Sequence, residues 1–360
     1  MTKQFPWESK VVDSIFAMTA KYGIPYFSNY VNSDLSPEDA LSMCCRLRLD
    51  TSELKKRGGG LFGSNPLTGS IGVVTLNLPR LAYESQDEQE FISALHGLSK
   101  LAKESLEIKR NVIEKQTERG MYPFSQCSLE AVKQRNGRYW ANHFSTIGIV
   151  GMEEACLNLF GKEGSLTTEK GQSFALQVLT SLRESIQGFQ EETGNFYNLE
   201  ATPAEGASYR LANLDKRAFG DIITAGEKVA YYTNSSQLPV GYTDDLYETL
   251  EKQDALQCQY TGGTVLHLYL AQRIEDPKLA KQLVRNVCTR YKLPYVSLTP
   301  TFSTCKNHGY LDGEVEFCPY CGEKTEVWTR VVGYLRPKED FHPGKQEEHR
   351  QRKSYMVKVS

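Results

Sequence analysis

Residues 71–78 read IGVVTLNL, an almost unbroken run of apolar and β-branched side chains. A strand with one face in water alternates polar and apolar residues, whereas a strand buried on both faces reads as a continuous apolar run. Strands of the second kind occur in parallel sheets that helices cover on both faces. The run therefore predicts a buried strand and, with it, an α/β fold.

Helical patterns surround this strand along the chain. Residues 87–119 predict a long helix, and residues 168–194 predict another that ends at a glycine. In the first helix we expect one stripe to face the core, made of Phe91, Leu95, Leu98, Leu101 and Ile108. Shorter elements are expected as helices over residues 215–230, 243–257 and 276–291 and as strands over residues 24–31 and 295–300. Strands that alternate with long helices favour an α/β architecture.

The composition narrows the class of protein. The chain has 360 residues, of which 40% are hydrophobic and 24% charged, the profile of a folded globular protein. Its formal net charge is -2, whereas a general nucleic-acid or membrane-surface binder would be basic. No apolar run reaches the roughly 20 residues that span a bilayer, and the N-terminus lacks the apolar core of a signal peptide. We expect a cytoplasmic protein with no membrane and no nucleic-acid partner.

Residues 305–322 read CKNHGYLDGEVEFCPYCG and hold two pairs of metal-ligand residues. Cys305 and His308 form one pair, and Cys318 and Cys321 form the other. Each pair fits a tight knuckle turn, and two knuckles together supply four ligands in the tetrahedral arrangement that zinc prefers. A closed four-ligand site leaves no open position, so we expect structural zinc. The other interpretation of His308 is an ordinary surface histidine.

Once these knuckles are in view, the segments around them are recognisable. The sequence resembles the anaerobic (class III) ribonucleoside-triphosphate reductases over nearly the whole chain. The stretches that carry the resemblance are SMCCRLRLD (residues 42–50), SNPLTGSIGVVTLNLPRLAY (64–83), RYWANHFSTIGIVGMEEACLNLFG (138–161), NLEATPAEGASYRLANLD (198–215), YYTNSSQLPV (231–240), CGEKTEVWTRVVGYLRP (321–337) and GKQEE (344–348).

The resemblance implies half of a ten-stranded α/β barrel of the glycyl radical enzyme type, with a C-terminal zinc ribbon and a radical loop. We expect residues 1–298 to form the second half of the barrel with its finger loop, residues 299–335 the zinc-binding module, and residues 336–360 the glycyl radical loop and tail. Family members also carry an N-terminal regulatory domain and the first barrel half. The chain is thus expected to be one product of a split gene, a fragment or a degenerate copy. The implied partners are an N-terminal half-chain that completes the barrel and a second copy in a homodimer.

The chemistry that the resemblance implies is the reduction of ribonucleoside triphosphates to deoxyribonucleotides. The strong 3′ C–H bond of the ribose must first be broken homolytically, which needs a radical. Glycine suits radical storage because its Cα bears no side chain, so the radical can flatten and delocalise into the flanking amides. The resemblance implies Gly344 for this role and a radical S-adenosylmethionine activase that installs the radical. It implies formate as the reductant, with a thiol system, as in some relatives, as the alternative. The other interpretation of Gly344 is a turn glycine.

A cysteine must carry the radical from the glycine to the sugar. The resemblance favours Cys45, which directly precedes an arginine, and Cys44 is the alternative. Neighbours on an extended segment point in opposite directions, so both thiols cannot face the sugar. The other interpretation of this pair is two packed core thiols.

Substrate contacts are expected from polar residues of the matching stretches, namely Asn65, Asn234, Ser235 and Ser236. Amide and hydroxyl groups can bind ribose hydroxyls and phosphates, but the same residue types also form turns and cap helices. Glu200 and Glu205 are expected as polar contacts in the barrel or as ordinary solvated or paired carboxylates, and His143 as a core histidine.

Two other functions stay open from the sequence. A glycyl radical enzyme acting on another substrate would share the glycine and the cysteine but would not bind ribonucleotides. An inactive zinc-ribbon interaction protein would need neither Cys45 nor Gly344.

Overall fold

The computed structural model describes residues 1–33, 40–42, 48–50 and 67–355. Its described helices are α1 (Lys10–Tyr22), α3 (Leu78–Glu84), α4 (Glu88–Glu118), α5 (Pro123–Asn136), α6 (Met152–Phe160), α7 (Glu169–Thr193), α8 (Gly206–Ala218), α9 (Leu246–Gln257), α10 (Pro277–Arg290) and α11 (Pro343–Gln351). Its described strands are β1 (Phe27–Ser28), β2 (Ala40–Ser42), β3 (Arg48–Asp50), β4 (Ser70–Asn77), β5 (Phe144–Val150), β6 (Phe196–Glu200), β7 (Leu266–Leu270), β8 (Tyr295–Pro300), β9 (Phe302–Cys305), β10 (Gly309–Asp312), β11 (Glu326–Arg330) and β12 (Leu335–Pro337).

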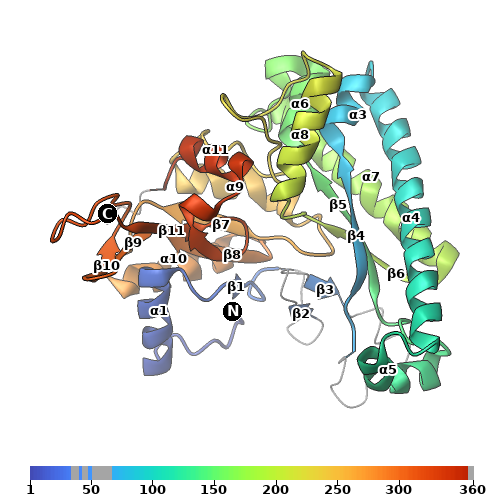
Figure 1. Cartoon of the computed structure of the whole chain (residues 1–360), viewed down its shortest axis with the longest axis horizontal. Helices are drawn as coiled ribbons and strands as arrows, with labels where there is room; N and C mark the ends of the chain where they lie inside the picture. Colours follow the sequence, from blue (N-terminus) through green and yellow to red (C-terminus); the bar gives the residue numbers. More distant parts are fainter. Residues whose placement is uncertain (34–39, 43–47, 51–66, 356–360) are drawn as a thin grey trace.

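A parallel sheet with the order β4-β5-β6 forms the centre of one lobe (Figure 1). Every residue of β5 is buried, and neighbouring strands pair with both of its edges. The helices α4 and α7 pack on this sheet and contribute apolar side chains to the largest core cluster. This arrangement confirms the α/β fold expected from the sequence.

The strand predicted from IGVVTLNL is present as β4. The prediction that this strand is buried on both faces is only partly correct. β4 is an edge strand among the described residues, and Val73 on it is 43% exposed. The strand that is buried on both faces is β5, although its sequence FSTIGIV contains Ser145 and Thr146. The apolar run at β4 therefore marks a strand that pairs along one edge only among the described residues.

The second lobe holds a sheet with the order β1-β8-β7, in which β7 and β8 are parallel and β1 is antiparallel to β8. The helices α1 and α10 pack against each other, and both contribute to its core cluster. An antiparallel sheet with the order β10-β9-β11-β12 follows at the C-terminal end. The helix α11 comes last and lies over the junction between the lobes (Figure 1).

Several predicted elements differ from the structure. The strand expected over residues 24–31 is reduced to Phe27–Ser28. The helix expected over residues 215–230 is wrong, because α8 ends at Ala218 and the chain then turns. Gly226, with a φ of 85°, packs against the backbone carbonyl of Val229, a conformation and a closeness that a helix does not allow.

The predicted core stripe of α4 is also partly wrong. Phe91 and Leu95 are buried as expected and Leu98 is half-buried, but Leu101 is 61% exposed and Ile108 is 64% exposed. The buried stripe continues through Ala102 and Leu106 instead, which lie at the i, i+4 spacing of one helix face. The helix therefore carries a second apolar row that the described part of the chain leaves exposed.

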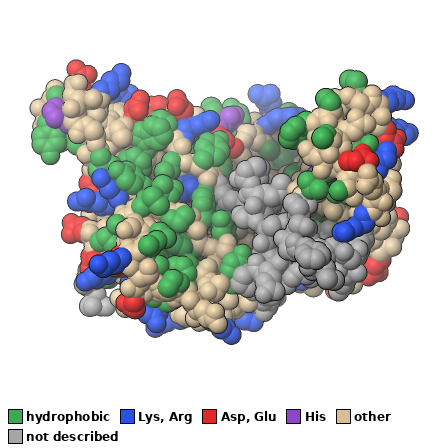
Figure 2. Space-filling view, turned by 90° about the horizontal axis from the view of Figure 1, so that it is seen from below, with side chains coloured by type: hydrophobic (Ala, Val, Ile, Leu, Met, Phe, Trp, Pro, Cys, Tyr) green, Lys and Arg blue, Asp and Glu red, His purple; other side chains and the backbone are tan. Residues whose placement is uncertain are grey.

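Figure 2 shows the face of the molecule seen from below. Hydrophobic side chains gather over one half of it, and Lys, Arg, Asp and Glu side chains mix along the rim. The mixture of both signs agrees with the net charge of -2. In the described part of the chain, no helix is both long enough and apolar enough to cross a membrane.

Candidate active site and metal cluster

A pocket lies between the two lobes, at the carboxyl end of β6 and beside β7. Its walls come from four segments that lie far apart in the sequence. They are residues 201–203, residues 233–243, residues 265–269, and residues of the C-terminal part that include Val332, Glu348, Arg352, Lys353 and Tyr355; Thr249 and Gln253 of α9 complete the lining. In α/β sheets, ligands commonly bind outside the carboxyl ends of the strands, so this pocket is the candidate active site.

Backbone hydrogen bonds fix residues 233–236 at the wall of the pocket. The turn between β5 and α6 donates from Gly151 N to the Thr233 carbonyl at 2.8 Å and from Met152 N to the Ser235 carbonyl at 3.0 Å. Ser235 has a φ of 42°, a left-handed conformation that costs a non-glycine residue energy and persists only when its surroundings enforce it. The segment is therefore held in one shape before any ligand arrives.

Of the three residues predicted in this segment, two line the pocket. Asn234 and Ser235 do so, and the Oδ1 atom of Asn234 is buried without a hydrogen-bond partner among the described residues. The hydroxyl of Ser236 instead lies 2.7 Å from the Tyr260 hydroxyl in the core. The structure thus brings Asn234 and Ser235 to the pocket, and it turns the side chain of Ser236 away from it.

A buried glutamate that sequence reasoning missed supports this segment. Glu154 on α6 is 1% exposed and accepts hydrogen bonds from the backbone N–H of Thr233 at 3.1 Å and from its hydroxyl at 2.6 Å. Burial raises the pKa of Glu154 to about 7, although the hydrogen bond from Thr233 acts in the opposite direction. Its only signal in the sequence was its place in the stretch over residues 138–161 that carries the resemblance.

The helix α11 packs into the protein through charged side chains. Lys345 is 0% exposed and forms an ion pair with Glu348, which is 2% exposed. Arg352 pairs with the other carboxylate oxygen of Glu348 at 3.0 Å and stacks 3.6 Å above the centre of the Tyr269 ring. Burial alone would raise the pKa of Glu348, but the charges of Lys345 and Arg352 outweigh it and hold that pKa below its ordinary value.

Gly344 lies in the first turn of α11, where the sequence predicted a loop. It is buried, and a Cβ atom at this position would lie 2.9 Å from the Cβ atom of Tyr209 and 3.3 Å from that of Tyr231. Real Cβ atoms essentially never show a contact as short as 2.9 Å, so the close approach of Tyr209 favours glycine here, and Tyr231 leaves little further room. Close packing is thus one sufficient reason for a glycine at position 344.

A second glycine of the C-terminal part lies beside the pocket, and sequence reasoning missed it. Gly333 stands in the turn between β11 and β12, next to Val332, which lines the pocket. The carbonyl oxygen of Gly333 accepts hydrogen bonds from Arg330 at 3.2 Å and from the Tyr26 hydroxyl. Its signal was its position inside the stretch over residues 321–337 that carries the resemblance.

Arg330 links this turn by hydrogen bonds to the segment after α1 and to β8. Its side chain is buried and also donates to the Gly23 carbonyl at 2.7 Å and to the Thr299 hydroxyl at 3.0 Å. The Tyr334 hydroxyl donates to Glu205 at 2.9 Å, which fastens the turn to the start of α8. Glu205 is thus hydrogen-bonded at the C-terminal turn, and Glu200 is buried at the end of β6.

The predicted metal ligands converge. The ligand atoms of Cys305, His308, Cys318 and Cys321 all lie within 4.8 Å of one another. The Sγ atoms of Cys305 and Cys321 are 3.6 Å apart, and His308 Nδ1 lies 3.7 Å from Cys305 Sγ and 3.5 Å from Cys318 Sγ. Zinc bonds of about 2.3 Å to sulfur and about 2.0–2.1 Å to nitrogen place tetrahedral ligand atoms about 3.6–3.8 Å apart. The donor set and its spacing therefore fit one zinc ion.

The two knuckles have the backbone that such a site needs. Gly309 and Gly322 take φ values of 71° and 72°, which favour glycine. In the second knuckle, Gly322 N donates to the Cys318 carbonyl and Cys318 N donates to the Glu323 carbonyl, both at 2.8 Å. His308 belongs to the cluster, although the sequence left a surface role open for it.

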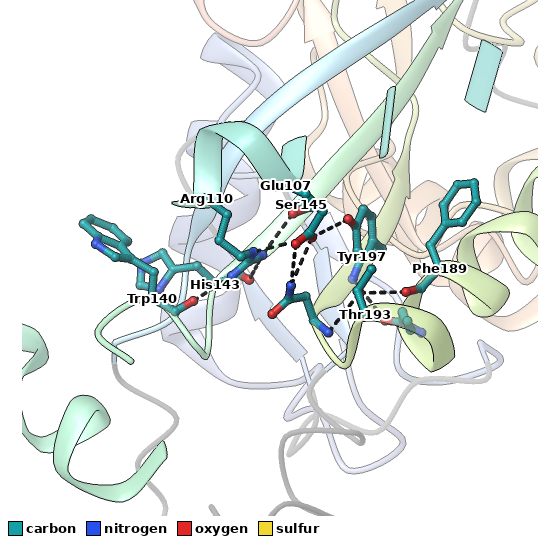
Figure 3. Close-up of polar contacts among 10 residues, drawn as sticks. Glu107, Arg110, Trp140, His143, Ser145, Phe189, Thr193 and Tyr197 are labelled. Atoms are coloured by element: carbon teal, nitrogen blue, oxygen red, sulfur yellow. Dashed lines mark hydrogen bonds and ion pairs between the residues drawn. The ribbon is translucent and has the colours of Figure 1, made fainter. Parts of the chain in front are cut away.

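The polar cluster of Figure 3 lies at the other end of the first sheet, where β5 and β6 begin. Arg110 donates to the carbonyls of Trp140 and His143, each at 2.8 Å, while Glu107 accepts from the Tyr197 hydroxyl at 2.5 Å. Burial and the neighbouring Arg110 lower the pKa of His143 to about 4, so this histidine is neutral near pH 7. His143 is 8% exposed, and the pocket-lining residues do not include it, in agreement with the core role expected from the sequence.

The remaining predicted residues, Cys44, Cys45 and Asn65, lie outside the described residues. The backbone strands β2 and β3 pair in antiparallel fashion, with Ala40 opposite Asp50, and the two cysteines lie between these strands in the sequence.

Comparison with known families identifies the chain. The family model described as anaerobic ribonucleoside-triphosphate reductase matches residues 1–355. The chain belongs to that family. This membership confirms the resemblance seen in the sequence.

Curated proteins similar to this family member carry the same family name. The anaerobic ribonucleoside-triphosphate reductase of Haemophilus influenzae is 28% identical over 308 residues, which are 80% of this chain and 43% of that protein. The enzyme of the same name from Enterobacteria phage T4 is 26% identical over 305 residues, which are 78% of this chain and 47% of that protein. The chain therefore spans less than half the length of these curated relatives.

Solved structures of the family share the fold. A structure named anaerobic ribonucleotide reductase aligns with a TM-score of 0.68 and 26% identity, over 81% of this chain and 45% of that one. The reductase from Thermotoga maritima in complex with dATP and CTP aligns with a TM-score of 0.69 and 24% identity, over 93% of this chain and 52% of that one. These matches confirm an α/β fold of the glycyl radical enzyme type for this family member.

Proposed function

We propose that the chain is the C-terminal catalytic half of an anaerobic reductase that converts ribonucleoside triphosphates to deoxyribonucleotides. The observation that carries the proposal is the pocket between the lobes of a chain that belongs to this family. The rigid segment over residues 233–235 forms one wall, and the charged face of α11 forms another. The partner in this proposal is a polypeptide that supplies the rest of the barrel.

The proposed chemistry begins on a glycine from which an S-adenosylmethionine activase has removed one hydrogen atom. The glycyl radical takes a hydrogen atom from the thiol of Cys45, or of Cys44 as the alternative, and the resulting thiyl radical takes the 3′ hydrogen of the ribose. The 2′ hydroxyl then leaves as water. Formate supplies the two reducing electrons and becomes carbon dioxide, and the 3′ hydrogen returns from the thiol.

The sequence predicts Gly344 as the radical store, and the geometry favours Gly333. A glycyl radical is stabilised when the two flanking peptide planes are coplanar with Cα. The α-helical φ and ψ of about −63° and −42° twist those planes apart, and Gly344 lies in a helix with two tyrosines closed against it. Gly333 lies in a turn beside the pocket, and Arg330 and Tyr26 hold its carbonyl oxygen. We propose Gly333 as the store and keep Gly344 as the competing assignment.

The proposed binding site for the triphosphate group is the pocket wall made by Asn234, Ser235 and the basic residues at the end of α11. Arg352 and Lys353 line the pocket, and Glu348 is the carboxylate between them and Lys345. Amide, hydroxyl and cationic donors together suit phosphate oxygens. Asn65 is retained as a proposed contact to the ribose hydroxyls.

The proposed zinc site is structural. Three cysteines and His308 complete a tetrahedral set, which leaves no open ligand position for substrate or water. Zinc would link the two knuckles and stabilise the small sheet from which the turn containing Gly333 projects.

A test of the whole proposal needs the activated complex under anaerobic conditions. With the activase, formate and the partner polypeptide present, each ribonucleoside triphosphate is supplied in turn and deoxyribonucleotide formation is measured. A complex that carries an organic radical and binds no ribonucleotide would instead support a glycyl radical enzyme with another substrate. A complex that never acquires a radical would support the zinc-ribbon interaction protein.

A further inference from the structure

The edge of β4 lacks the protection that natural proteins give to exposed strands. β4 pairs only with β5 among the described residues, so one edge of an eight-residue strand has no described backbone partner. Its sequence, SIGVVTLN, has no charged residue and no proline, the usual devices against unwanted strand pairing. An edge of this length and composition offers backbone groups that a strand of another polypeptide can pair with.

An apolar row on α4 lies beside this edge. Leu98, Leu101, Ser105, Ile108 and Val112 follow one another at alternating spacings of three and four residues, the pattern of a helix face that packs on another helix. Of these, Leu101, Ile108 and Val112 are 61%, 64% and 50% exposed. In Figure 1, α4 runs along the outer side of its lobe, and the end of α7 projects past it in this view.

The strand edge and the helix row form one continuous surface. Val74, Thr75 and Leu76 of β4 line a shallow groove together with Leu98 and Leu101 of α4. Val73 on the same strand is 43% exposed. We call this groove and the apolar row on α4 the β4–α4 surface. Its shape fits one strand that extends the sheet and one helix that follows it, the repeating unit of an α/β fold.

We infer that the β4–α4 surface binds the polypeptide that corresponds to the part of the reductases that this chain does not match. This inference rests on the proposed function and specifies where the partner docks. That unmatched part is 57% of the length of the Haemophilus influenzae relative, since the chain covers 43% of it. The bound partner contributes an extended strand along β4 and an apolar helix face against α4.

The position of β4 favours this occupant over a second copy of the chain. The Thr75 hydroxyl on β4 lies 3.3 Å from the Thr202 hydroxyl, and Thr202 lines the candidate active site. A strand added beyond β4 therefore continues the same sheet around that pocket. Closing a sheet into a barrel also removes its open edges.

The experiment places a photo-crosslinking benzoylphenylalanine at Ile108 of the full chain, expressed in the cells that are its source. We expect one major adduct whose peptides match the reductase family outside the part that this chain matches. An adduct with a second copy of this chain, an adduct with an unrelated protein, or no adduct would each overturn the inference. The same probe at Val11 on α1, which is 69% exposed, is the matched control and should not form this adduct.

A second measurement uses the purified partner and the double variant Leu101→Glu, Ile108→Glu. Both side chains are exposed, so the variant should keep the circular dichroism of the wild type while its affinity falls at least tenfold. Val11→Glu should bind like the wild type. Unchanged affinity of the double variant would overturn the inference. Because binding is measured without activase or substrate, a complex that binds but does not reduce nucleotides would count against the proposed function alone.

Discussion

The buried guanidinium of Arg330 donates to the carbonyl oxygen of Gly333 at 3.2 Å, so a charged side chain fixes the turn that lies beside the pocket. The same side chain satisfies the Gly23 carbonyl and the Thr299 hydroxyl. This single residue thus joins β11 and the turn after it to the start of the chain and to β8.

Replacement of Arg330 by alanine should strongly destabilise the second lobe. The change removes this donor from buried acceptors on Gly23 and Thr299 and from the half-buried carbonyl of Gly333. Hydrogen bonds to charged groups contribute about 1.5–3 kcal/mol each. We expect a loss of about 3–5 kcal/mol in the free energy of unfolding, measured by urea titration. Arg336→Ala, at a side chain that is 39% exposed, should change it by less than about 1 kcal/mol. Equal effects of the two variants would contradict the role assigned to Arg330.

Substitution of the two C-terminal glycines should locate the radical. Gly333→Ala is expected to abolish the organic radical signal in electron paramagnetic resonance and the backbone cleavage that air causes in activated protein. Gly344→Ala should keep both, with some loss of stability because the new methyl group meets Tyr209. Mass spectrometry of the cleaved wild type gives the same answer, since cleavage at the two sites yields fragments that differ by residues 333–343. Loss of the signal only in Gly344→Ala would restore the assignment predicted from the sequence.

Serine replacements should identify the thiol that reacts with the sugar. Cys45→Ser is expected to abolish deoxyribonucleotide formation by the activated complex while the glycyl radical signal stays, because the radical is stored elsewhere. Cys44→Ser should retain most of the activity. The reverse result would assign the thiyl radical to Cys44.

Zinc removal should unfold the knuckles without unfolding the lobes. We expect about one zinc ion per chain by elemental analysis, and chelation should increase hydrogen exchange in β9 and β10 while β5 stays protected. Cys318→Ser should lower the zinc content, whereas Cys127→Ser, at an exposed cysteine outside the cluster, should leave it unchanged. Full zinc content in Cys318→Ser would refute the ligand set.

The buried Glu154 should make stability depend on pH. Its pKa is raised to about 7 in the folded protein from 4.5, so the folded state favours the protonated form. Stability should therefore be greatest below about pH 4.5 and fall as the pH rises to about 7, by about 3 kcal/mol from this group. The measured quantity is the difference between wild type and Glu154→Gln in urea unfolding from pH 5 to pH 8. A constant difference would show that Glu154 does not titrate in this range.

The sequence predicted best where a pattern is local. The spacing of the knuckles predicted that Cys305, His308, Cys318 and Cys321 come together, because ligand geometry within a turn depends on a few neighbouring residues. Strand β8 and helices α9 and α10 also lie close to their predicted positions. The helix expected over residues 215–230 failed because glycine and turn residues follow Ala218, and the apolar pattern alone does not register them.

Features that depend on tertiary neighbours could not be predicted in this way. The run at β4 reads as a strand buried on both faces, yet most of its residues are only partly buried, and within the described ranges it pairs with β5 alone. Leu101 and Ile108 were assigned to the core stripe because periodicity identifies an apolar face but not what covers it. The sequence pattern also could not predict where Ser236 and Gly333 lie relative to the pocket. Their positions depend on segments far away in the chain.

The face by which α11 packs is made of charged side chains and not of apolar ones. This determines how the C-terminal segment would behave if the helix detached. When a helix that packs through an apolar face detaches, it exposes two hydrophobic surfaces that promote aggregation. On detachment of α11, water rehydrates the charged groups of Lys345, Glu348 and Arg352. The detached helix therefore stays soluble and can bind to the same surface again.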